Sequence, residues 1–192
     1  YTKDYLENFE KSFIFNGGEN FIKYAKTDEN LDDLVLDINN SNPDLILICA
    51  NSVDAARVVQ YLKIKGINTQ IASSEWAMTP SFIGNTGKYS EGIIFNIDYD
   101  EHSQNEDFIK FLNKYKEKYK IEPSLYASKG YELARVIIEL LKMGDQTELK
   151  KNLLIKKEFK GLQDTIIFDQ YGDVIREFNT FKVINGKFEK VE

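Results

Sequence analysis

The sequence predicts an α/β fold in which parallel strands alternate with helices. A short, continuous apolar run at residues 45–50 follows an Asn-Pro-Asp turn, which is typical of a strand covered on both faces. Apolar residues at helical spacing come next and stop at Gly66, and residues 69–72 then return as a second strand. A strand, a helix and a strand in this order predict a right-handed crossover between two parallel strands.

The first half of the chain continues this alternation. Helical spacing predicts an opening helix with Leu6, Phe9 and Phe13 on one face, ended by Gly17-Gly18. The further elements that we expect here are a strand at 21–25, a short helix at 31–38, a short helix at 80–83 and a strand at 91–95. Alternating helices and strands of this kind indicate a parallel sheet with flanking helices.

Two long helices begin after residue 105 and change the character of the chain. We expect them at 106–120 and 123–143, and the second is apolar round most of its circumference, so it should be buried on several sides. The rest should form a short helix at 146–154, a hairpin of 165–168 with 174–178, and a hairpin of 180–184 with 187–191. Asn185-Gly186, between alternating residues, is the strongest short hairpin signal in the sequence.

Composition excludes several functional classes. The 192 residues are 42% hydrophobic and 29% charged, which describes a folded globular protein. A net charge of −6 argues against nucleic acid as a partner, because phosphate contacts need a basic surface. The single cysteine, Cys49, lies in the first predicted strand, and we interpret it as a small buried hydrophobe. The chain opens in an amphipathic helix without a starting methionine or a signal peptide, so we expect a fragment or a processed form.

The sequence offers no candidate for catalysis, a metal or a cofactor. It lacks a glycine-rich dinucleotide loop, a P-loop and a nucleophile elbow. His102 stands in a polar, acidic stretch without a second histidine or a cysteine near it, so we interpret it as a surface residue.

The best candidate for a binding site follows the two strands of the central unit. Asn51 comes after the first strand, and Ser73, Ser74, Glu75 and Trp76 come after the second. Ligands of open parallel sheets bind at the carboxyl ends of the strands. Glu75 and Trp76 could hold an ammonium group by charge and by cation–π attraction. The alternative, an ordinary loop acid beside a core tryptophan, is equally compatible with the sequence.

Four blocks of sequence resemble a known family. They are NPDLILICANSVDAARVVQYLKIKGI (42–67), SSEWAMTPSFIGNTGKYSEGIIF (73–95), YKEKYKIEPSLYASKGYELARVI (115–137) and GLQDTIIFDQYGDVIREFNTFKVINGKF (161–188). In this order they resemble the C-terminal part of type I periplasmic binding proteins of the leucine/isoleucine/valine-binding group, also called extracellular ligand-binding receptors. The resemblance covers nearly all of the chain.

The resemblance implies a two-lobed clamp that closes on a small solute, such as an amino acid, and hands it to the membrane subunits of an ABC transporter. Residues 1–97 and 178–192 would form the second lobe. Residues 98–177 would belong to the first lobe, whose main sheet is absent from the sequence. A location outside the cytoplasm follows, in the periplasm or as a membrane-anchored lipoprotein.

The resemblance also implies roles for individual residues. Tyr1, Asn51 and Glu75 would contact the ligand, with Glu75 on an α-amino group, while Ser73, Ser74 and Trp76 would shape the pocket. Asn51 departs from the aromatic residue of the branched-chain binders, which argues against leucine-like specificity. The apolar helix at 123–143 would pair with the missing N-terminal lobe or with another copy of the chain. The alternatives are a ligand-sensing lobe of a receptor or regulator with the same fold, and a small α/β enzyme.

Overall fold

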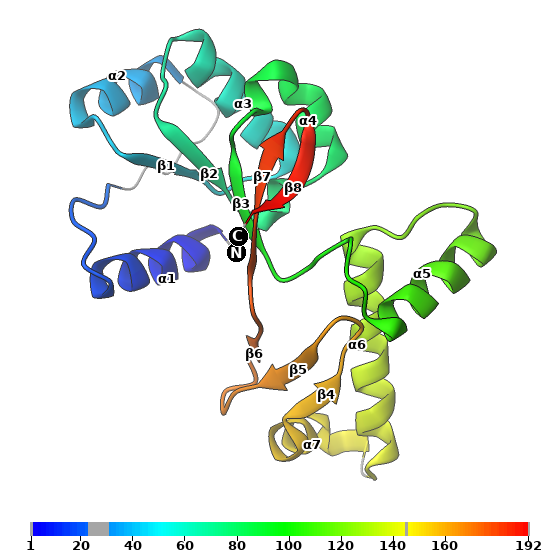
Figure 1. The fold of residues 1–192 in the computed structure, drawn as a ribbon. Helices are drawn as coiled ribbons and strands as arrows, with labels where there is room; N and C mark the ends of the chain where they lie inside the picture. The colour runs from blue at the N-terminus through cyan, green and yellow to red at the C-terminus, as the bar shows by residue number, and fades with distance from the viewer. Residues whose placement is uncertain (1, 23–30, 145, 192) are drawn as a thin grey trace. The chain divides into compact units, whose positions relative to one another are not determined.

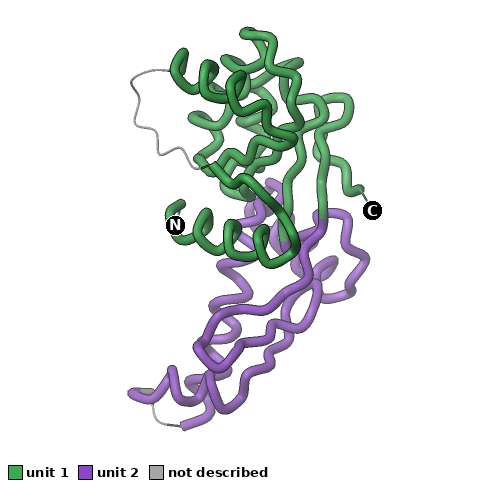
Figure 2. Tube along the Cα trace, turned by 90° about the vertical axis from the view of Figure 1, so that its left-hand side faces the viewer, with its two compact units in different colours: residues 1–97, 180–192 green, residues 98–179 purple. Residues whose placement is uncertain are grey.

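A computed structural model describes residues 2–22, 31–144 and 146–191 of the chain. The chain forms two compact units, which are coloured separately in Figure 2. Unit 1 comprises residues 1–97 and 180–192, and unit 2 comprises residues 98–179. The chain therefore passes between the units twice. The assignment of these segments to the lobes of a larger clamp stays a prediction.

Unit 1 is built on a five-stranded sheet with the order β1-β2-β3-β7-β8 (Figure 1). The strands are β1 (Leu45–Ile48), β2 (Gln70–Ser73), β3 (Ile94–Ile97), β7 (Asn179–Ile184) and β8 (Lys187–Val191). The first three strands are parallel, and β7 and β8 form the expected antiparallel hairpin. Asn185 and Gly186 connect the two strands with φ of 52° and 70°, as a tight hairpin turn requires. The predicted α/β fold class is confirmed.

The helices that the sequence predicted in unit 1 are present, although α2 and α4 each end three residues later than expected. They are α1 (Thr2–Phe15), α2 (Leu31–Ser41), α3 (Ser52–Ile64) and α4 (Pro80–Thr86), with the 3₁₀ turns η1 (Glu75–Ala77) and η2 (Gly87–Ser90). Gly17 has a φ of 87°, and the Gly18 N–H donates to the Phe13 carbonyl at 2.9 Å, so the glycine pair ends α1 as predicted. Helices α3 and α4 pack on one another. Phe95 of β3 lies edge-on to Phe82 of α4 in the core.

Unit 2 combines helices with a small antiparallel sheet. Its helices are α5 (Glu106–Tyr119), α6 (Leu125–Lys142) and α7 (Leu149–Lys156), the last preceded by η3 (Gln146–Glu148). Its strands are β4 (Glu158–Lys160), β5 (Thr165–Phe168) and β6 (Val174–Ile175), paired in that order. Val136 and Leu140 of α6 pack with Phe159 and Ile166 of this sheet to form one of its hydrophobic clusters.

Charged side chains from the first and the last segments of unit 2 meet in one cluster on α6. Arg176, just before the chain leaves the unit, donates from Nη2 to Oε2 of Glu132 on α6 at 2.8 Å. Both side chains are only 7% exposed. The other nitrogen, Nη1, lies 3.6 Å from Oδ2 of Asp98, the first residue of the unit, which also pairs with Lys129. Because α6 holds both Glu132 and Lys129, this cluster fixes the first and the last segments of unit 2 to the same helix.

Several predicted boundaries were wrong. Phe21 and Ile22 are not in a strand, and the rest of the strand predicted at 21–25 lies outside the described residues. β1 ends two residues early, at Ile48, so Cys49 lies beyond the strand and is only half-buried. β3 runs from Ile94 to Ile97 because the pairing with β2 begins at Ile94, later than its apolar run suggested. β4 was not predicted at all.

The long helix α6 buries a different face from the one its apolar residues suggest. Its buried residues include Ser128 and Glu132 as well as Val136 and Leu140. Its exposed side chains include several large hydrophobic ones: Tyr126, Tyr131, Leu133, Ile137, Ile138 and Leu141. Within unit 2, therefore, α6 is not buried on several sides as the sequence predicted.

Candidate functional site

The candidate site lies at the carboxyl ends of the parallel strands in unit 1. Ile48 of β1 pairs with Ser73 of β2, so the two strands end level with one another. The Ser74 N–H donates to the Ile48 carbonyl at 3.0 Å, which continues the pairing by one residue and places Cys49 beside Ser74. The N-terminal end of α1 lies on this side of the sheet (Figure 1).

Asn51 is held by the helix that it begins. Its Oδ1 accepts hydrogen bonds from the backbone N–H groups of Val53 and Asp54, both at 3.0 Å, and its Nδ2 donates to the Asp54 carboxylate at 2.6 Å. This is the N-cap that its position before α3 predicted. With Oδ1 used twice, Asn51 retains only an amide N–H for a ligand.

The two adjacent serines differ in their hydrogen bonding. Ser73 is buried and donates from Oγ to the Ile48 carbonyl at 3.0 Å. Ser74 is 0% exposed, and its Oγ has no hydrogen-bond partner in the described part of the chain. The Ile48 carbonyl already accepts from Ser73 Oγ and from the Ser74 N–H, so both of its lone pairs are occupied.

Glu75 and Trp76 follow directly and begin the turn η1. Glu75 is half-buried, while Trp76 is 42% exposed, so the indole is not a core side chain. Of the two interpretations left open by the sequence, the structure disfavours the core tryptophan. A carboxylate beside an accessible indole can bind a cation by charge and by the electron-rich ring face.

Tyr5 and Cys49 complete this edge, and sequence reasoning did not assign either to the site. Burial raises the pKa of the Cys49 thiol, and the neighbouring Ser74 hydroxyl, whose contact with the sulfur falls short of hydrogen-bond geometry, opposes that rise. Burial also raises the pKa of the Tyr5 phenol, and the charges of Cys49 and Glu75 add to this, so Tyr5 lies within electrostatic reach of both. Tyr5 could have been found from its spacing, since it lies one helical turn after Tyr1. Tyr1 itself lies outside the described residues.

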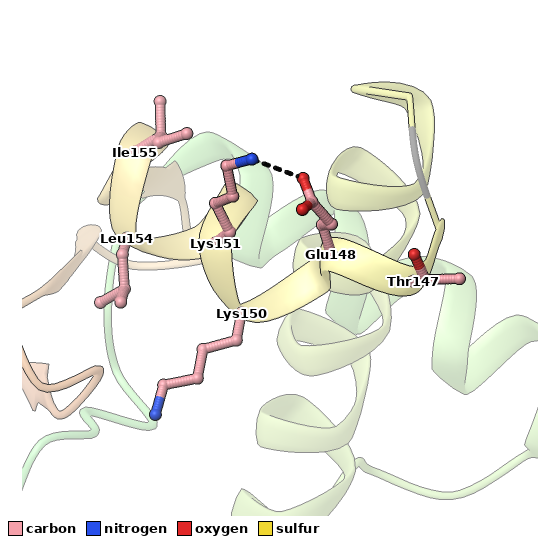
Figure 3. Close-up of a pocket in the computed structure, with 6 residues that line it drawn as sticks. All are labelled: Thr147, Glu148, Lys150, Lys151, Leu154 and Ile155. Atoms are coloured by element: carbon pink, nitrogen blue, oxygen red, sulfur yellow. Dashed lines mark hydrogen bonds and ion pairs between the residues drawn. The ribbon is translucent and has the colours of Figure 1, made fainter.

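Unit 2 offers no comparable arrangement at its surface pocket. The pocket lies over η3 and α7 and is lined by Thr147, Glu148, Lys150, Lys151, Leu154 and Ile155 (Figure 3). The Lys151 ammonium and the Glu148 carboxylate are 2.7 Å apart and neutralise one another. The pocket therefore has neither enclosure nor converging polar groups.

The described residues contain no group of three or more side chains that could bind a metal ion. They also contain no helix long and apolar enough to cross a membrane. His102 is exposed as predicted, and its Nε2 lies 3.7 Å from the Glu101 carboxylate.

A match to a known protein family shows which family the chain belongs to. The sequence pattern of a family described as periplasmic binding protein matches residues 1–187. The chain belongs to this family. No curated protein sequence matches it.

Solved structures of solute-binding proteins share its fold. A leucine-binding protein from Thermotoga maritima is 24% identical with a TM-score of 0.83, and the match covers 97% of this chain and 55% of that one. A branched-chain amino acid binding protein from Streptococcus pneumoniae, in complex with isoleucine, is 21% identical with a TM-score of 0.77. That match covers 96% of this chain and 56% of the other. A solute-binding protein from R. palustris, in complex with benzoate, is 18% identical with a TM-score of 0.76. That match covers 96% of this chain and 53% of the other. The chain thus spans about half the length of these relatives.

Proposed function

We propose that the chain is part of a solute-binding protein that captures an amino acid or a similar small polar solute in a cleft between two lobes. One observation carries the proposal: in a chain of this family, Glu75 and the exposed Trp76 stand at the carboxyl edge of a parallel sheet. Open α/β sheets bind their ligands at this edge. The chain acts by binding and release, not by catalysis.

Glu75 is the residue with the clearest role in this proposal. Its carboxylate would accept hydrogen bonds from the solute ammonium, with the Trp76 ring beside it, and the remaining Asn51 N–H would point to a solute acceptor. Ser73 is occupied by the backbone and would act as support. Tyr1 keeps the ligand-contacting role that the family resemblance implies, as a proposal.

We place the intact protein outside the cytoplasm, where it would deliver the solute to the membrane subunits of an ABC transporter. The relative from R. palustris is described as the solute-binding protein of an ABC transporter. The lobe assignment belongs to the same proposal: unit 1 would be the second lobe, and unit 2 would extend the first.

The exposed apolar face of α6 supports this arrangement. Leu133 is 61% exposed and Ile138 is 51% exposed, and soluble monomers rarely expose contiguous apolar patches of this kind. We propose that the rest of the first lobe covers this face in the intact protein. The 192-residue chain alone should then self-associate through α6. Light scattering after gel filtration tests this: Leu133→Glu should yield a monomer, and a wild-type chain that is already monomeric would contradict the proposal.

The binding role is tested by changing Glu75 in the intact protein. A thermal-shift panel of free amino acids and benzoate identifies a solute, and calorimetry then measures its affinity. Glu75→Gln should weaken binding by about 2–5 kcal/mol, as expected when a buried charge loses its partner. Glu189→Gln makes the same chemical change on the exposed strand β8 and should leave the affinity unchanged. An affinity for Glu75→Gln within threefold of wild type would exclude this carboxylate from the site.

A further inference from the structure

The Ser74 hydroxyl is an exception among the buried hydroxyls of the described chain. The others that are buried donate to a backbone carbonyl: Ser73 to Ile48, Thr86 to Phe82, Ser90 to Gly87 and Ser128 to Ser124. Ser74 Oγ has no such partner, although the side chain is fully covered. Burying a hydroxyl without a hydrogen bond is unfavourable, and a position that retains one calls for an explanation.

The surrounding backbone cannot supply the missing bond. The nearest carbonyl in the strand pairing, that of Ile48, already accepts two hydrogen bonds. Ser74 is extended, with φ of −66° and ψ of 156°, and it continues the parallel register in which Ile48 faces Ser73. Cys49 is therefore its neighbour across the pairing, and a thiol is only a weak donor and a weak acceptor.

Cys49 is the accessible member of this pair. It lies one residue beyond the end of β1 and is half-buried, so solvent reaches it while Ser74 is covered. Glu75 adjoins Ser74 in the chain, and Tyr5 lies within electrostatic reach of both Cys49 and Glu75. Cys49 and Ser74 thus lie at the same edge of the sheet as Glu75, whose carboxylate we propose as the partner of the solute ammonium.

We propose that Cys49 and Ser74 form a second polar contact of the solute site, in which the Ser74 hydroxyl obtains its hydrogen bond from the bound solute. The inference rests on the proposed solute-binding function and extends it to specificity. The solute would carry a hydroxyl, carbonyl or amide close to the ammonium held by Glu75. Because Ser74 is fully covered in the free state, the contact requires the atoms that cover it to move when the solute binds.

The first test separates stability from binding in the intact protein. Ser74→Ala removes a hydroxyl that makes no hydrogen bond in the free state, so its melting temperature should be equal to or above that of wild type. Its affinity for the solute identified in the thermal-shift panel should fall at least fivefold. Ser90→Ala is the matched control, since Ser90 is equally buried but donates to the Gly87 carbonyl at 2.8 Å at the end of the turn η2. That variant should melt earlier and bind normally.

The second test uses the single cysteine of the chain as a reporter. N-ethylmaleimide should label Cys49 in the free protein, and saturating solute should slow that labelling at least tenfold, as followed by mass spectrometry of the peptide that contains residue 49. Among isosteric amino acids, L-threonine should bind at least tenfold more tightly than L-valine, because a site built to hydrogen-bond a hydroxyl rejects the analogue without it. Ser74→Ala should reduce this preference.

The outcomes distinguish the inference from the function on which it rests. If no amino acid and no benzoate binds the wild-type protein, the proposed function fails and the inference fails with it. If a solute binds but leaves the labelling rate of Cys49 unchanged, and Ser74→Ala binds within twofold of wild type, only the inference is overturned. Slower labelling, weaker binding by Ser74→Ala and an unchanged or higher melting temperature together support it.

Discussion

Replacing Arg176 by methionine should destabilise unit 2 strongly. The guanidinium is 7% exposed and donates to Glu132 at 2.8 Å, and Glu132 is 7% exposed as well. Methionine keeps much of the side-chain volume but leaves the Glu132 carboxylate buried without a cation. Breaking a buried pair by removing one partner costs about 3–5 kcal/mol.

The neighbouring groups decide where in this range the cost falls. Asp98 lies 3.6 Å from Arg176 but also pairs with Lys129, so it retains a cation in the variant. Glu132 retains only the Leu162 N–H, which donates to its Oε1 at 2.6 Å. The loss therefore falls mainly on Glu132. Glu132→Gln keeps an acceptor for Leu162 and leaves Arg176 near Asp98, so it should cost less, about 1–3 kcal/mol.

Urea unfolding can assign this loss to the correct unit. The only tryptophan, Trp76, lies in unit 1, so its fluorescence follows that unit, while far-UV circular dichroism follows both. With an m-value of about 2 kcal/mol/M, Arg176→Met should lower the midpoint of unit 2 by about 2 M. Arg176→Met combined with Glu132→Leu should recover much of the loss, since no charge is left unpaired. A loss below about 1 kcal/mol for Arg176→Met would refute the reasoning, because exposed ion pairs have values of that size.

Two further predictions concern a titrating carboxyl and a helix cap. Burial raises the pKa of Asp164 above its ordinary value of 3.8, ahead of the opposing effect of Arg176. The folded protein then holds this proton more tightly than the unfolded chain, so the contribution of Asp164 to stability falls as pH rises above 3.8. Asp164→Asn should flatten this part of the stability–pH curve in urea titrations from pH 4 to 7, and an unchanged slope would contradict the direction of the shift. Asn51→Ala should cost about 1 kcal/mol through loss of the α3 cap, whereas Asn51→Asp should retain the cap and the melting temperature. If Asn51→Asp nevertheless changes the solute affinity, Asn51 contacts the solute as well as the helix.

Local patterns predicted most of the fold because several signals agree in each element. Three of these signals have the predicted role in the structure: Asn-Gly forms the hairpin turn, Asn51 caps α3, and the glycine pair ends α1. β4 was missed because its three residues, Glu158-Phe159-Lys160, include only one apolar side chain. Its extended form depends on the antiparallel partner β5, in which Phe159 faces Ile166. Pairing between strands is a tertiary property that a short segment does not reveal.

The sequence was enough to select an edge of the sheet for the candidate site, but not to predict the hydrogen bonds of the side chains there. Open parallel sheets bind at their carboxyl ends, so the loops with Asn51 and Glu75 could be selected from the order of elements alone. Which serine is satisfied could not be predicted, since it depends on the Ile48 carbonyl, which Ser73 and the Ser74 N–H both occupy. Cys49 was misassigned because an apolar run shows that a strand is present without fixing its last residue.

The orientation of α6 follows from the charge cluster inside unit 2. A helix in a soluble monomer normally turns its aliphatic side chains inward and its charges outward. Here Glu132 faces inward because Arg176 and the Leu162 N–H satisfy it, while Leu133 and Ile137 face solvent. One face of α6 therefore packs on a polar cluster inside unit 2. The other face carries exposed apolar side chains that unit 2 does not cover. In the two-lobed protein that we propose, the segment that covers this face of α6 would belong to the lobe that supplies the other side of the solute site at Glu75.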